Sequence, residues 1–344
     1  MIRIGVVGLG FMGVTHLKSY RQVPGAEVVA VCDAYQLPAD GDLSKVAGNL
    51  GDNDPLRLDW DRIRGYTRFE TMLAETEVDV VDICVPTKTH PDLTVAALAA
   101  GKHVICEKPM ARTAALARTM VAAAERSPGV LMPAMCMRFW PEWRWVKEAI
   151  DDGRFGKALA ARFRRMTEPP AWGREVYFQG QDSGGALLDL HIHDSDFVQY
   201  CFGRPTRVYS MGLSRYSGAV DHVVTQYQVA SGAVVSAEGS WLVSEGYGFS
   251  MAYTILFERA TADYDSARGP DALRLFEPGQ KPRTVSIEGQ DGYVGELRHL
   301  IAAVTAGQAP TWVTPREGLS AVEICEAEER SIQTGAVVEL APSA

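Results

Sequence analysis

A glycine-rich turn near the start of the chain constrains the fold more than any other feature. Gly8-Leu9-Gly10-Phe11-Met12-Gly13 follows the apolar run Ile2–Gly8 and opens the segment Gly13–Gln22, whose apolar residues have helical spacing. In such a turn the first glycine permits the tight bend, the second lets the backbone approach a pyrophosphate, and the third lets the helix pack on the strand. The helix N-terminus also offers N–H groups and the positive end of its dipole to phosphate. The turn therefore predicts a strand–turn–helix unit that binds a dinucleotide.

An acidic residue at the end of the next strand makes this prediction more specific. Asp33 lies 20 residues beyond Gly13 and follows the apolar segment Val28–Cys32. At this place a carboxylate would accept hydrogen bonds from the hydroxyls of the adenosine ribose and would repel a 2′-phosphate. Neither Ala34 nor Tyr35 supplies a cation to neutralise that phosphate, so we expect NAD rather than NADP. The alternative is a plain glycine turn beside a helix-capping aspartate.

Composition and charge narrow the class of protein. The chain of 344 residues is long enough for two domains, and its net charge of −9 without a long basic run is unsuited to nucleic acid or to an anionic membrane. No apolar stretch approaches the roughly 20 residues of a membrane span. The apolar start runs into glycines without a basic region or a cleavage site, which favours a strand over a signal peptide. Six cysteines without CxxC spacing predict reduced thiols and a cytoplasmic protein without disulfides.

Residues 1–125 alternate between short β-branched runs and helical stretches, which predicts an α/β domain with a parallel sheet covered on both faces. The expected strands are Ile2–Gly8, Val28–Cys32, Val78–Val85 and His103–Cys106, and the expected helices are Gly13–Gln22, Tyr66–Ala74 and Asp92–Ala100. Residues 34–65 are polar and irregular, and we expect an excursion with one short helix there. This first domain would bind the dinucleotide.

Residues 126–344 have a different character and predict a second domain that binds substrate. Two-residue alternation and tight turns such as Ala230-Ser231-Gly232 indicate antiparallel hairpins. The expected strands are Val130–Met137, Ala158–Met166, Val208–Leu213, His222–Val229, Ala233–Trp241 and Met251–Glu258. The expected helices are Glu142–Asp151, Gly185–Tyr200, Gly292–Ala306 and Pro315–Thr334, and the last of them would pack back on the first domain.

A lysine follows the fourth strand of the first domain. The segment His103-Val104-Ile105-Cys106-Glu107-Lys108-Pro109-Met110 puts a charged pair at the carboxyl end of a buried strand, where ligands bind in open α/β sheets. Pro109 fixes the turn. Beside an oxidised nicotinamide, Lys108 could orient a substrate hydroxyl or donate a proton. The alternative is an exposed Glu–Lys pair on a loop.

A segment rich in histidine and aspartate is the most unusual part of the second domain. In the run from Gly184 to Asp196, Asp189 and His193 are four residues apart, so on a helix they would share a face that Asp196 and Tyr200 continue. Histidine is the natural general base near neutral pH, and a neighbouring carboxylate would orient it.

Two other interpretations of this segment stay open. Its two histidines and three aspartates could bind a metal, but His191 and His193 would point apart on a helix and no other Cys/His cluster completes a site. We therefore predict no metal. The segment could also be a purely structural, hydrogen-bonded helix start.

Together these residues resemble the Gfo/Idh/MocA family of oxidoreductases. The matching features are Gly8–Gly13, Val85-Pro86-Thr87 with His90, Glu107-Lys108-Pro109, Arg138-Phe139-Trp140-Pro141, Gly184-Gly185 with Asp189 and His193, and the region from Pro310 through Gly318 to Ala327. The resemblance implies an N-terminal Rossmann domain with a doubly wound parallel sheet and a C-terminal α/β domain with a large, open, predominantly antiparallel sheet. Two departures are His191, where members often have glycine, and the longer excursion over residues 34–65.

The resemblance also implies site residues. Lys108, Asp189 and His193 would form the catalytic group, with His193 taking the hydroxyl proton while hydride leaves the same carbon. The cofactor contacts would be Gly8, Gly10, Phe11, Met12, Gly13, Asp33, Val85, Pro86, Thr87, His90, Glu107 and Lys108. The substrate contacts would be Arg138, Trp140, Trp172 and Tyr177, although the aromatic residues of the loop Trp172–Asp182 could equally belong to the core.

The expected function is therefore NAD-dependent hydride transfer at a secondary hydroxyl of a sugar, cyclitol or related polyol. An NAD-using glycoside hydrolase of the same fold and a non-catalytic dinucleotide-sensing regulator are the alternatives. Net reduction of the cofactor would separate the first from the second. We also expect a homodimer or homotetramer, because an open sheet with alternating apolar residues such as Val223, Tyr227 and Val229 must cover its outer face.

Overall fold

The computed structural model describes residues 1–35, 37–46, 55–170 and 173–341. Its contacts divide the chain into two compact units, the first comprising Met1–Cys136 and Asp291–Leu319 and the second Met137–Gln290 and Ser320–Ala344. The division falls after Cys136 and not after residue 125, because the strand that begins near residue 130 extends the first sheet. Segment Asp291–Leu319 joins the first unit because its helix packs on the first helix of the chain.

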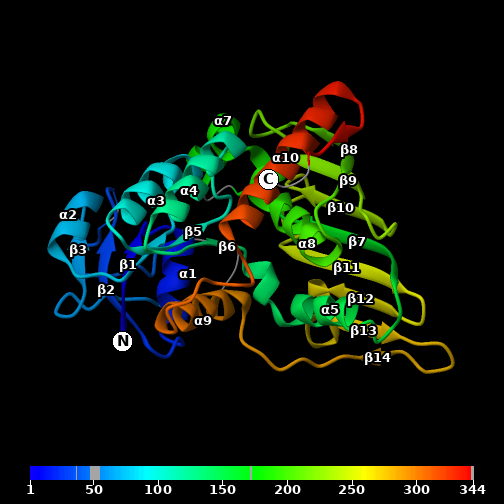
Figure 1. Cartoon of the computed structure of the whole chain (residues 1–344), viewed down its shortest axis with the longest axis horizontal. Helices are drawn as coiled ribbons and strands as arrows, with labels where there is room; N and C mark the ends of the chain where they lie inside the picture. Colours follow the sequence, from blue (N-terminus) through cyan, green and yellow to red (C-terminus); the bar gives the residue numbers. More distant parts are fainter. Residues whose placement is uncertain (36, 47–54, 171–172, 342–344) are drawn as a thin grey trace. The chain divides into compact units, whose positions relative to one another are not determined.

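The first unit contains a six-stranded sheet in the order β3-β2-β1-β4-β5-β6, in which all neighbouring strands are parallel (Figure 1). Its strands are β1 (Ile2–Val7), β2 (Ala26–Cys32), β3 (Arg64–Tyr66), β4 (Val80–Ile83), β5 (His103–Glu107) and β6 (Leu131–Ala134). Its helices include α1 (Phe11–Tyr20), α2 (Phe69–Glu75), α3 (His90–Ala99), α4 (Ala114–Arg126) and α9 (Gly292–Thr305). The strand order reverses between β1 and β4, and ligands bind doubly wound sheets at such a switch point.

The sequence predicted the long strands of this sheet because strands buried on both faces are continuous apolar runs. It missed β3, whose Tyr66 was assigned to a helix that begins only at Phe69, and it missed α4. The described part of residues 34–65 forms an isolated bridge between Asp42 and Arg57 and contains no helix, so the short helix expected there is absent from these residues. Positions 36 and 47–54 lie outside the described residues.

The second unit is built on a nine-stranded sheet in the order β14-β13-β12-β11-β7-β10-β9-β8-β15. Its strands are β7 (Ala158–Met166), β8 (Arg207–Leu213), β9 (His222–Gln228), β10 (Val234–Ser240), β11 (Ser250–Phe257), β12 (Thr261–Asp265), β13 (Leu273–Phe276), β14 (Arg283–Thr284) and β15 (Val338–Glu339). Strands β7 and β10 are parallel and the other neighbours are antiparallel, which confirms the large, predominantly antiparallel sheet. The four short strands β12 to β15 were not predicted.

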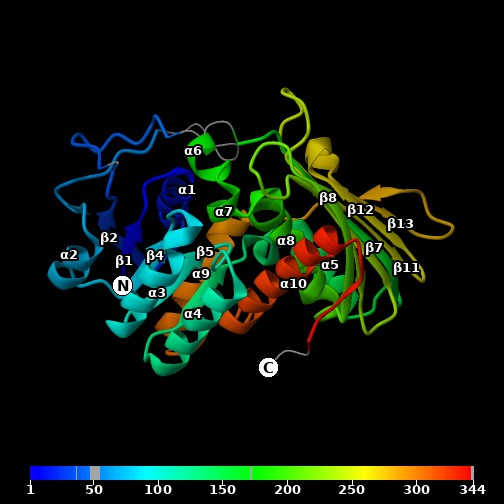
Figure 2. The same ribbon diagram turned by 90° about the horizontal axis from the view of Figure 1, so that it is seen from above.

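Helices cover one face of this second sheet. Figure 2 shows α5 (Pro141–Asp151), α8 (Ile192–Phe202) and the later part of α10 (Pro315–Thr334) along that face. Trp143 of α5 is fully buried there and packs edge-on against Phe197 and Tyr253, with ring centroids 4.8 and 5.3 Å apart. No helix among the described residues is both long and apolar enough to cross a membrane.

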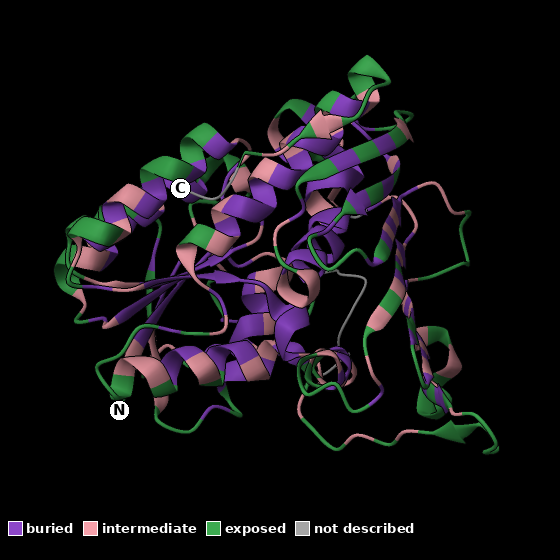
Figure 3. Cartoon of the chain, turned by 45° about the vertical axis from the view of Figure 1, so that its right-hand side comes forward, coloured by how far each residue is buried: buried purple, intermediate pink, exposed green. Residues whose placement is uncertain are grey.

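The opposite face of the second sheet carries exposed apolar side chains. Buried and exposed residues alternate along its strands (Figure 3). The residues Val223, Tyr227 and Val229, which the sequence suggested for the outer face, are buried on the helix-covered side, so that expectation was wrong in register. The exposed side chains include Met211 and Val234, which are 65% and 72% exposed.

Candidate active site

The glycine turn has the geometry of a phosphate site. Gly8 has a φ of 97°, and a Cβ at Gly8 or Gly13 would lie 2.4 Å from the Cys84 carbonyl oxygen or 1.9 Å from the Gly8 carbonyl oxygen, so neither position tolerates a side chain. A Cβ at Gly10 would meet no atom within 4 Å, so this backbone faces open space. Helix α1 begins directly after Gly10 with no acidic residue in its first turn. The turn therefore fits a bound pyrophosphate.

Asp33 lies beside this turn at the end of β2. Its Oδ2 accepts a hydrogen bond of 2.7 Å from the Leu9 backbone N–H, and its Oδ1 accepts one of 2.8 Å from the Tyr35 N–H. Both bonds fix the carboxylate at the edge of the glycine turn. Because each carboxylate oxygen has two lone pairs, the group can still accept hydrogen bonds from ribose hydroxyls.

His90 joins two segments that were predicted to bind the cofactor. Its Nδ1 lies 2.8 Å from the Pro109 carbonyl oxygen and its Nε2 lies 2.8 Å from the Val85 carbonyl oxygen. Burial lowers the pKa of His90, although the two carbonyl groups act in the opposite direction. With 1% of its surface exposed, His90 braces the loops that follow β4 and β5, whereas Pro86 and Thr87 reach the surface.

The charged pair after β5 is not an exposed pair on a loop. Glu107 is buried, and its Oε2 accepts a hydrogen bond of 3.0 Å from the Lys108 backbone N–H. Its Oε1 lies 3.2 Å from Nε2 of His16. Lys108 itself is half-buried. The carboxylate is therefore held at both oxygens, directly before the predicted catalytic lysine.

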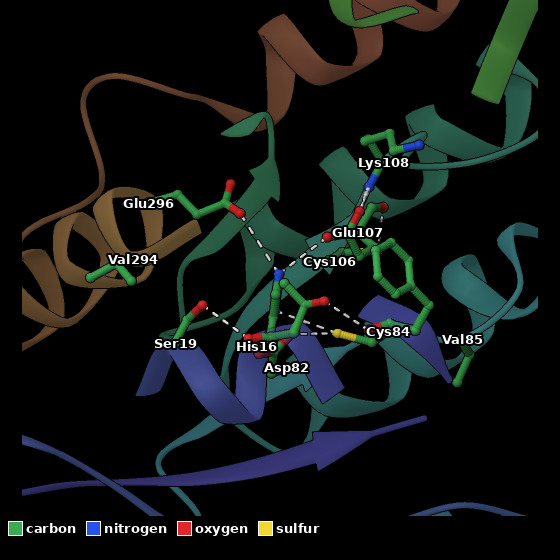
Figure 4. A network of polar contacts seen from close by, with 12 residues as sticks. His16, Ser19, Asp82, Cys84, Val85, Cys106, Glu107, Lys108, Val294 and Glu296 are labelled. Atoms are coloured by element: carbon green, nitrogen blue, oxygen red, sulfur yellow. Dashed lines mark hydrogen bonds and ion pairs between the residues drawn. The ribbon is translucent and has the colours of Figure 1, made fainter. Parts of the chain in front are cut away.

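His16 connects Glu107 to a buried polar cluster that the sequence analysis did not predict (Figure 4). Its Nδ1 lies 2.8 Å from Oδ2 of Asp82 on β4, and Cys84 donates a 3.2 Å hydrogen bond to the other oxygen of Asp82. Glu296 of α9 approaches Nε2 of His16 to 3.7 Å. One signal was available: a carboxylate within a buried strand such as Val80–Ile83 requires a buried partner.

In the second unit, the segment with Asp189 and His193 is not a regular α-helix from its start. Leu187–His191 forms a π-helical turn, and α8 follows from Ile192. Asp189 is half-buried, and His193 is 9% exposed. Such π-turns occur frequently at functional sites.

His191, at the end of this turn, belongs to a second buried network. Its Nε2 lies 3.1 Å from the Tyr227 hydroxyl and 3.4 Å from Oε1 of Glu328 on α10. The Tyr227 hydroxyl donates a 2.6 Å hydrogen bond to the same Glu328 oxygen, and burial together with this carboxylate holds the pKa of Tyr227 well above its usual value. Opposite the ring, Gly239 of β10 leaves the space that His191 fills. His191 is therefore a structural anchor of the turn.

Two buried ion pairs fix the first turn of α8. Arg165 of β7 donates two hydrogen bonds of 3.1 Å to Asp194, and Arg138 donates two of 2.8 and 2.7 Å to Asp196. Arg138 is fully buried and lies over the Tyr200 ring at 4.5 Å. This environment is that of a structural ion pair and not of a substrate ligand, so it contradicts the substrate-binding role expected for Arg138.

The predicted aromatic substrate contacts have mixed surroundings. Trp140 is half-buried directly before α5. The Tyr177 ring meets Trp241 edge-on at 6.1 Å and packs against the small apolar cluster that contains Leu190. Tyr177 therefore has at least a partial core role. Trp172 lies outside the described residues.

A parallel sheet in this order, with a glycine turn and a terminal aspartate at its switch point, defines a Rossmann dinucleotide-binding unit. Residues 2–135 match the family model described as "Oxidoreductase family, NAD-binding Rossmann fold", and residues 143–263 match the GFO/IDH/MocA C-terminal domain. The chain belongs to the GFO/IDH/MocA oxidoreductase family.

Relatives of known name match over almost the full chain. A myo-inositol 2-dehydrogenase from Thermotoga maritima is 26% identical and covers 98% of both chains. A D-apiose dehydrogenase from Paraburkholderia graminis is 29% identical, over 97% of this chain and 88% of its own. Among solved structures, levoglucosan dehydrogenase in complex with NADH has the same fold, with a TM-score of 0.85 at 22% identity over the whole of both chains.

Proposed function

We propose that this protein is an NAD-dependent dehydrogenase that transfers hydride between nicotinamide and a secondary hydroxyl of a sugar, cyclitol or related polyol. The observation that carries the proposal is the open glycine turn at Gly10 beside Asp33, in a chain of this oxidoreductase family. The names of the relatives support a polyol or sugar substrate, because inositol is a cyclitol and apiose is a sugar.

Each predicted residue has a distinct task in this proposal. Gly8, Gly10, Gly13 and the N-terminus of α1 would hold the pyrophosphate, and Asp33 the adenosine ribose. When bound, NAD supplies the acceptor for the hydride. The protein must then remove the hydroxyl proton, and a histidine has a suitable unperturbed pKa of about 6.5.

We assign His193 as this base and Asp189 as the carboxylate that orients it. Lys108 would stabilise the negative charge that develops on the reacting oxygen. The anchored start of α8 supports the choice of His193, because a general base must keep a fixed direction toward its proton. His191 is fully buried and engaged with Tyr227, which argues against it as the base.

We also propose NAD in preference to NADP. Asp33 would repel a 2′-phosphate, and the described neighbours Ala34 and Tyr35 bring no positive charge to that position. The six cysteines are all free thiols, five of them buried, which supports a cytoplasmic location.

The open face of the second sheet supports a homo-oligomer. Side chains from three neighbouring strands expose apolar surface there: Tyr209, Met211, Leu213, Val224 and Val234. Contiguous exposed apolar surface of this kind is usually covered by a partner, and in homo-oligomers the partner is a second copy.

Incubation of the purified protein with NAD and a panel of cyclitols, aldoses and anhydrosugars tests the proposed function. We expect stoichiometric NADH formation with at least one polyol. Cleavage of a glycoside without net NADH would overturn the proposal in favour of an NAD-using hydrolase. Tight NAD binding without turnover of any polyol would overturn it in favour of a dinucleotide sensor.

A further inference from the structure

The buried cluster around His16 connects the phosphate-binding helix to the residue that precedes Lys108. His16 lies on α1, its Nδ1 faces Asp82, and its Nε2 faces Glu107. All three side chains are nearly inaccessible to solvent, with Glu107 the most exposed of them at 6%. The second oxygen of Glu107 accepts the Lys108 N–H. A continuous path of polar contacts therefore runs from β4 through α1 to the end of β5.

The protonation state of His16 determines whether its ring can attract both the Asp82 and the Glu107 carboxylates. Burial acts to lower the pKa of His16, but Asp82 and Cys84, through charge and hydrogen bonds, together outweigh burial and hold the pKa well above the usual value. A protonated ring donates a hydrogen bond from Nδ1 to Asp82, and its Nε2 lies 3.2 Å from Glu107 as an ion pair without hydrogen-bond alignment. Burial raises the pKa of Glu296 well above its usual value, which disfavours a further negative charge beside His16. The other titratable neighbours, Tyr20, Cys84 and Tyr293, have pKa values raised mainly by burial.

We propose that His16 is a positioning residue, which as an imidazolium between Asp82 and Glu107 aims the Glu107 carboxylate and with it the backbone of Lys108. This inference rests on the proposed function, because it gives a catalytic purpose to the alignment of Lys108. A buried ion pair at 3.2 Å fixes the position of the carboxylate more strongly than apolar packing does.

A metal ion is the competing explanation for this cluster. Nε2 of His16 and one oxygen each of Glu107 and Glu296 lie within 4.8 Å of one another, as do Nδ1 of His16, Asp82 and Cys84. The two sets use opposite nitrogens of one ring, so they cannot share a single ion. The distances of 2.8 Å from Nδ1 to Asp82 and 3.2 Å from Nε2 to Glu107 are those of direct polar contacts, which favours an ion-pair network.

The test compares His16→Gln with the matched control Ser19→Ala in the complete NAD-loaded enzyme. Ser19 is buried on the same helix, but its hydroxyl donates to the Thr15 carbonyl and carries no charge. We expect His16→Gln to lower kcat about tenfold to a hundredfold, the value of a hydrogen bond to a charged group, with little change in substrate KM or NAD affinity. Ser19→Ala should keep the kcat of the wild-type enzyme.

A double-mutant cycle with Glu107→Gln distinguishes positioning from a general loss of structure. If His16 acts through Glu107, the double variant should lose no more kcat than Glu107→Gln alone. Should His16→Gln fold poorly, the cycle is repeated in a Glu296→Gln background, which keeps the shape of that side chain but removes a buried carboxyl group.

Three results would overturn the inference while the wild-type enzyme still forms NADH. These are an unchanged kcat in His16→Gln, additive effects of the His16 and Glu107 substitutions, and one equivalent of zinc per chain in the purified protein that disappears in His16→Gln. Failure of the wild-type enzyme to oxidise any polyol would instead overturn the proposed function, so the two failures are distinguishable.

Discussion

Gly239→Ala is a small substitution with a large expected effect, because it tests whether His191 fixes the catalytic turn. A Cβ at Gly239 would lie 2.8 Å from the His191 Cβ and 3.0 Å from its Nδ1, closer than real Cβ atoms approach. His191 cannot retreat easily, since its ring is held by Tyr227 and Glu328 and its backbone closes the π-turn Leu187–His191. The turn must therefore shift by several tenths of an ångström.

Two opposing contributions determine how much Gly239→Ala changes the free energy of unfolding. Overpacking of a rigid core costs about 1–3 kcal/mol. Gly239 lies in a strand without a positive φ, so alanine recovers about 0.5–1 kcal/mol of backbone entropy. The net loss of stability should be about 1–2 kcal/mol. A shift of the turn that carries Asp189 should also lower kcat, because a displacement of about 1 Å can cost about a hundredfold. We expect a fall of about tenfold.

Thermal unfolding and steady-state NADH formation measure the two effects, and His191→Gly provides the control. In that background the added methyl group meets no histidine, so Gly239→Ala should cost neither stability nor kcat beyond the loss caused by His191→Gly itself. Wild-type stability and kcat in the single variant Gly239→Ala would refute the reasoning. An equal loss in both backgrounds would show that the damage has another origin.

Three further predictions concern the proposed function. Asp33→Ser should lower the ratio of kcat/KM for NAD to that for NADP, because the carboxylate that repels the 2′-phosphate is gone; parallel kinetics with both cofactors measure this ratio. His193→Ala and Lys108→Ala should each lower kcat, the former by about 10²–10⁴-fold, with unchanged NAD affinity in calorimetry, since neither residue holds the phosphates. Met211→Asp together with Val234→Asp should place charges on the exposed sheet face and reduce the mass in light scattering toward the 37.5 kDa of one chain. A wild-type protein that is already monomeric at micromolar concentration would contradict the last prediction.

The sequence predicted those structural features that are determined by residues close together in the chain. The glycine turn needs three glycines at fixed spacing, and the buried parallel strands need continuous apolar runs, so both were visible without tertiary information. The alternation along β9 was also visible, but its register relative to the core was not. A period of two does not say which of Val223 or Val224 faces the helices, because that depends on what packs against the sheet.

The missed features depend on residues that are distant in the sequence. The π-turn ends at His191, whose partners Tyr227 and Glu328 are 36 and 137 positions away, so the helical spacing alone gave a regular helix. Arg138 was expected at the substrate because its neighbours match a family motif, but its side chain pairs with Asp196. His16 was hidden for the same reason, since its carboxylate partners come from separate strands and a helix.

Buried charges of this kind need a reason, because replacing a buried ion pair by apolar residues is often neutral or stabilising. The start of α8 suggests one. Two bidentate pairs, Arg165 with Asp194 and Arg138 with Asp196, attach two positions of one helical turn to different elements. Apolar packing would allow the helix to rotate slightly about its axis at low cost, whereas any rotation here lengthens hydrogen bonds in both pairs at once. His193 lies directly before Asp194. The two ion pairs, although they contribute little to stability, therefore limit the movement of its imidazole. A general base must be oriented toward one particular hydroxyl proton, so catalysis requires a fixed helix orientation more than it requires a more stable helix.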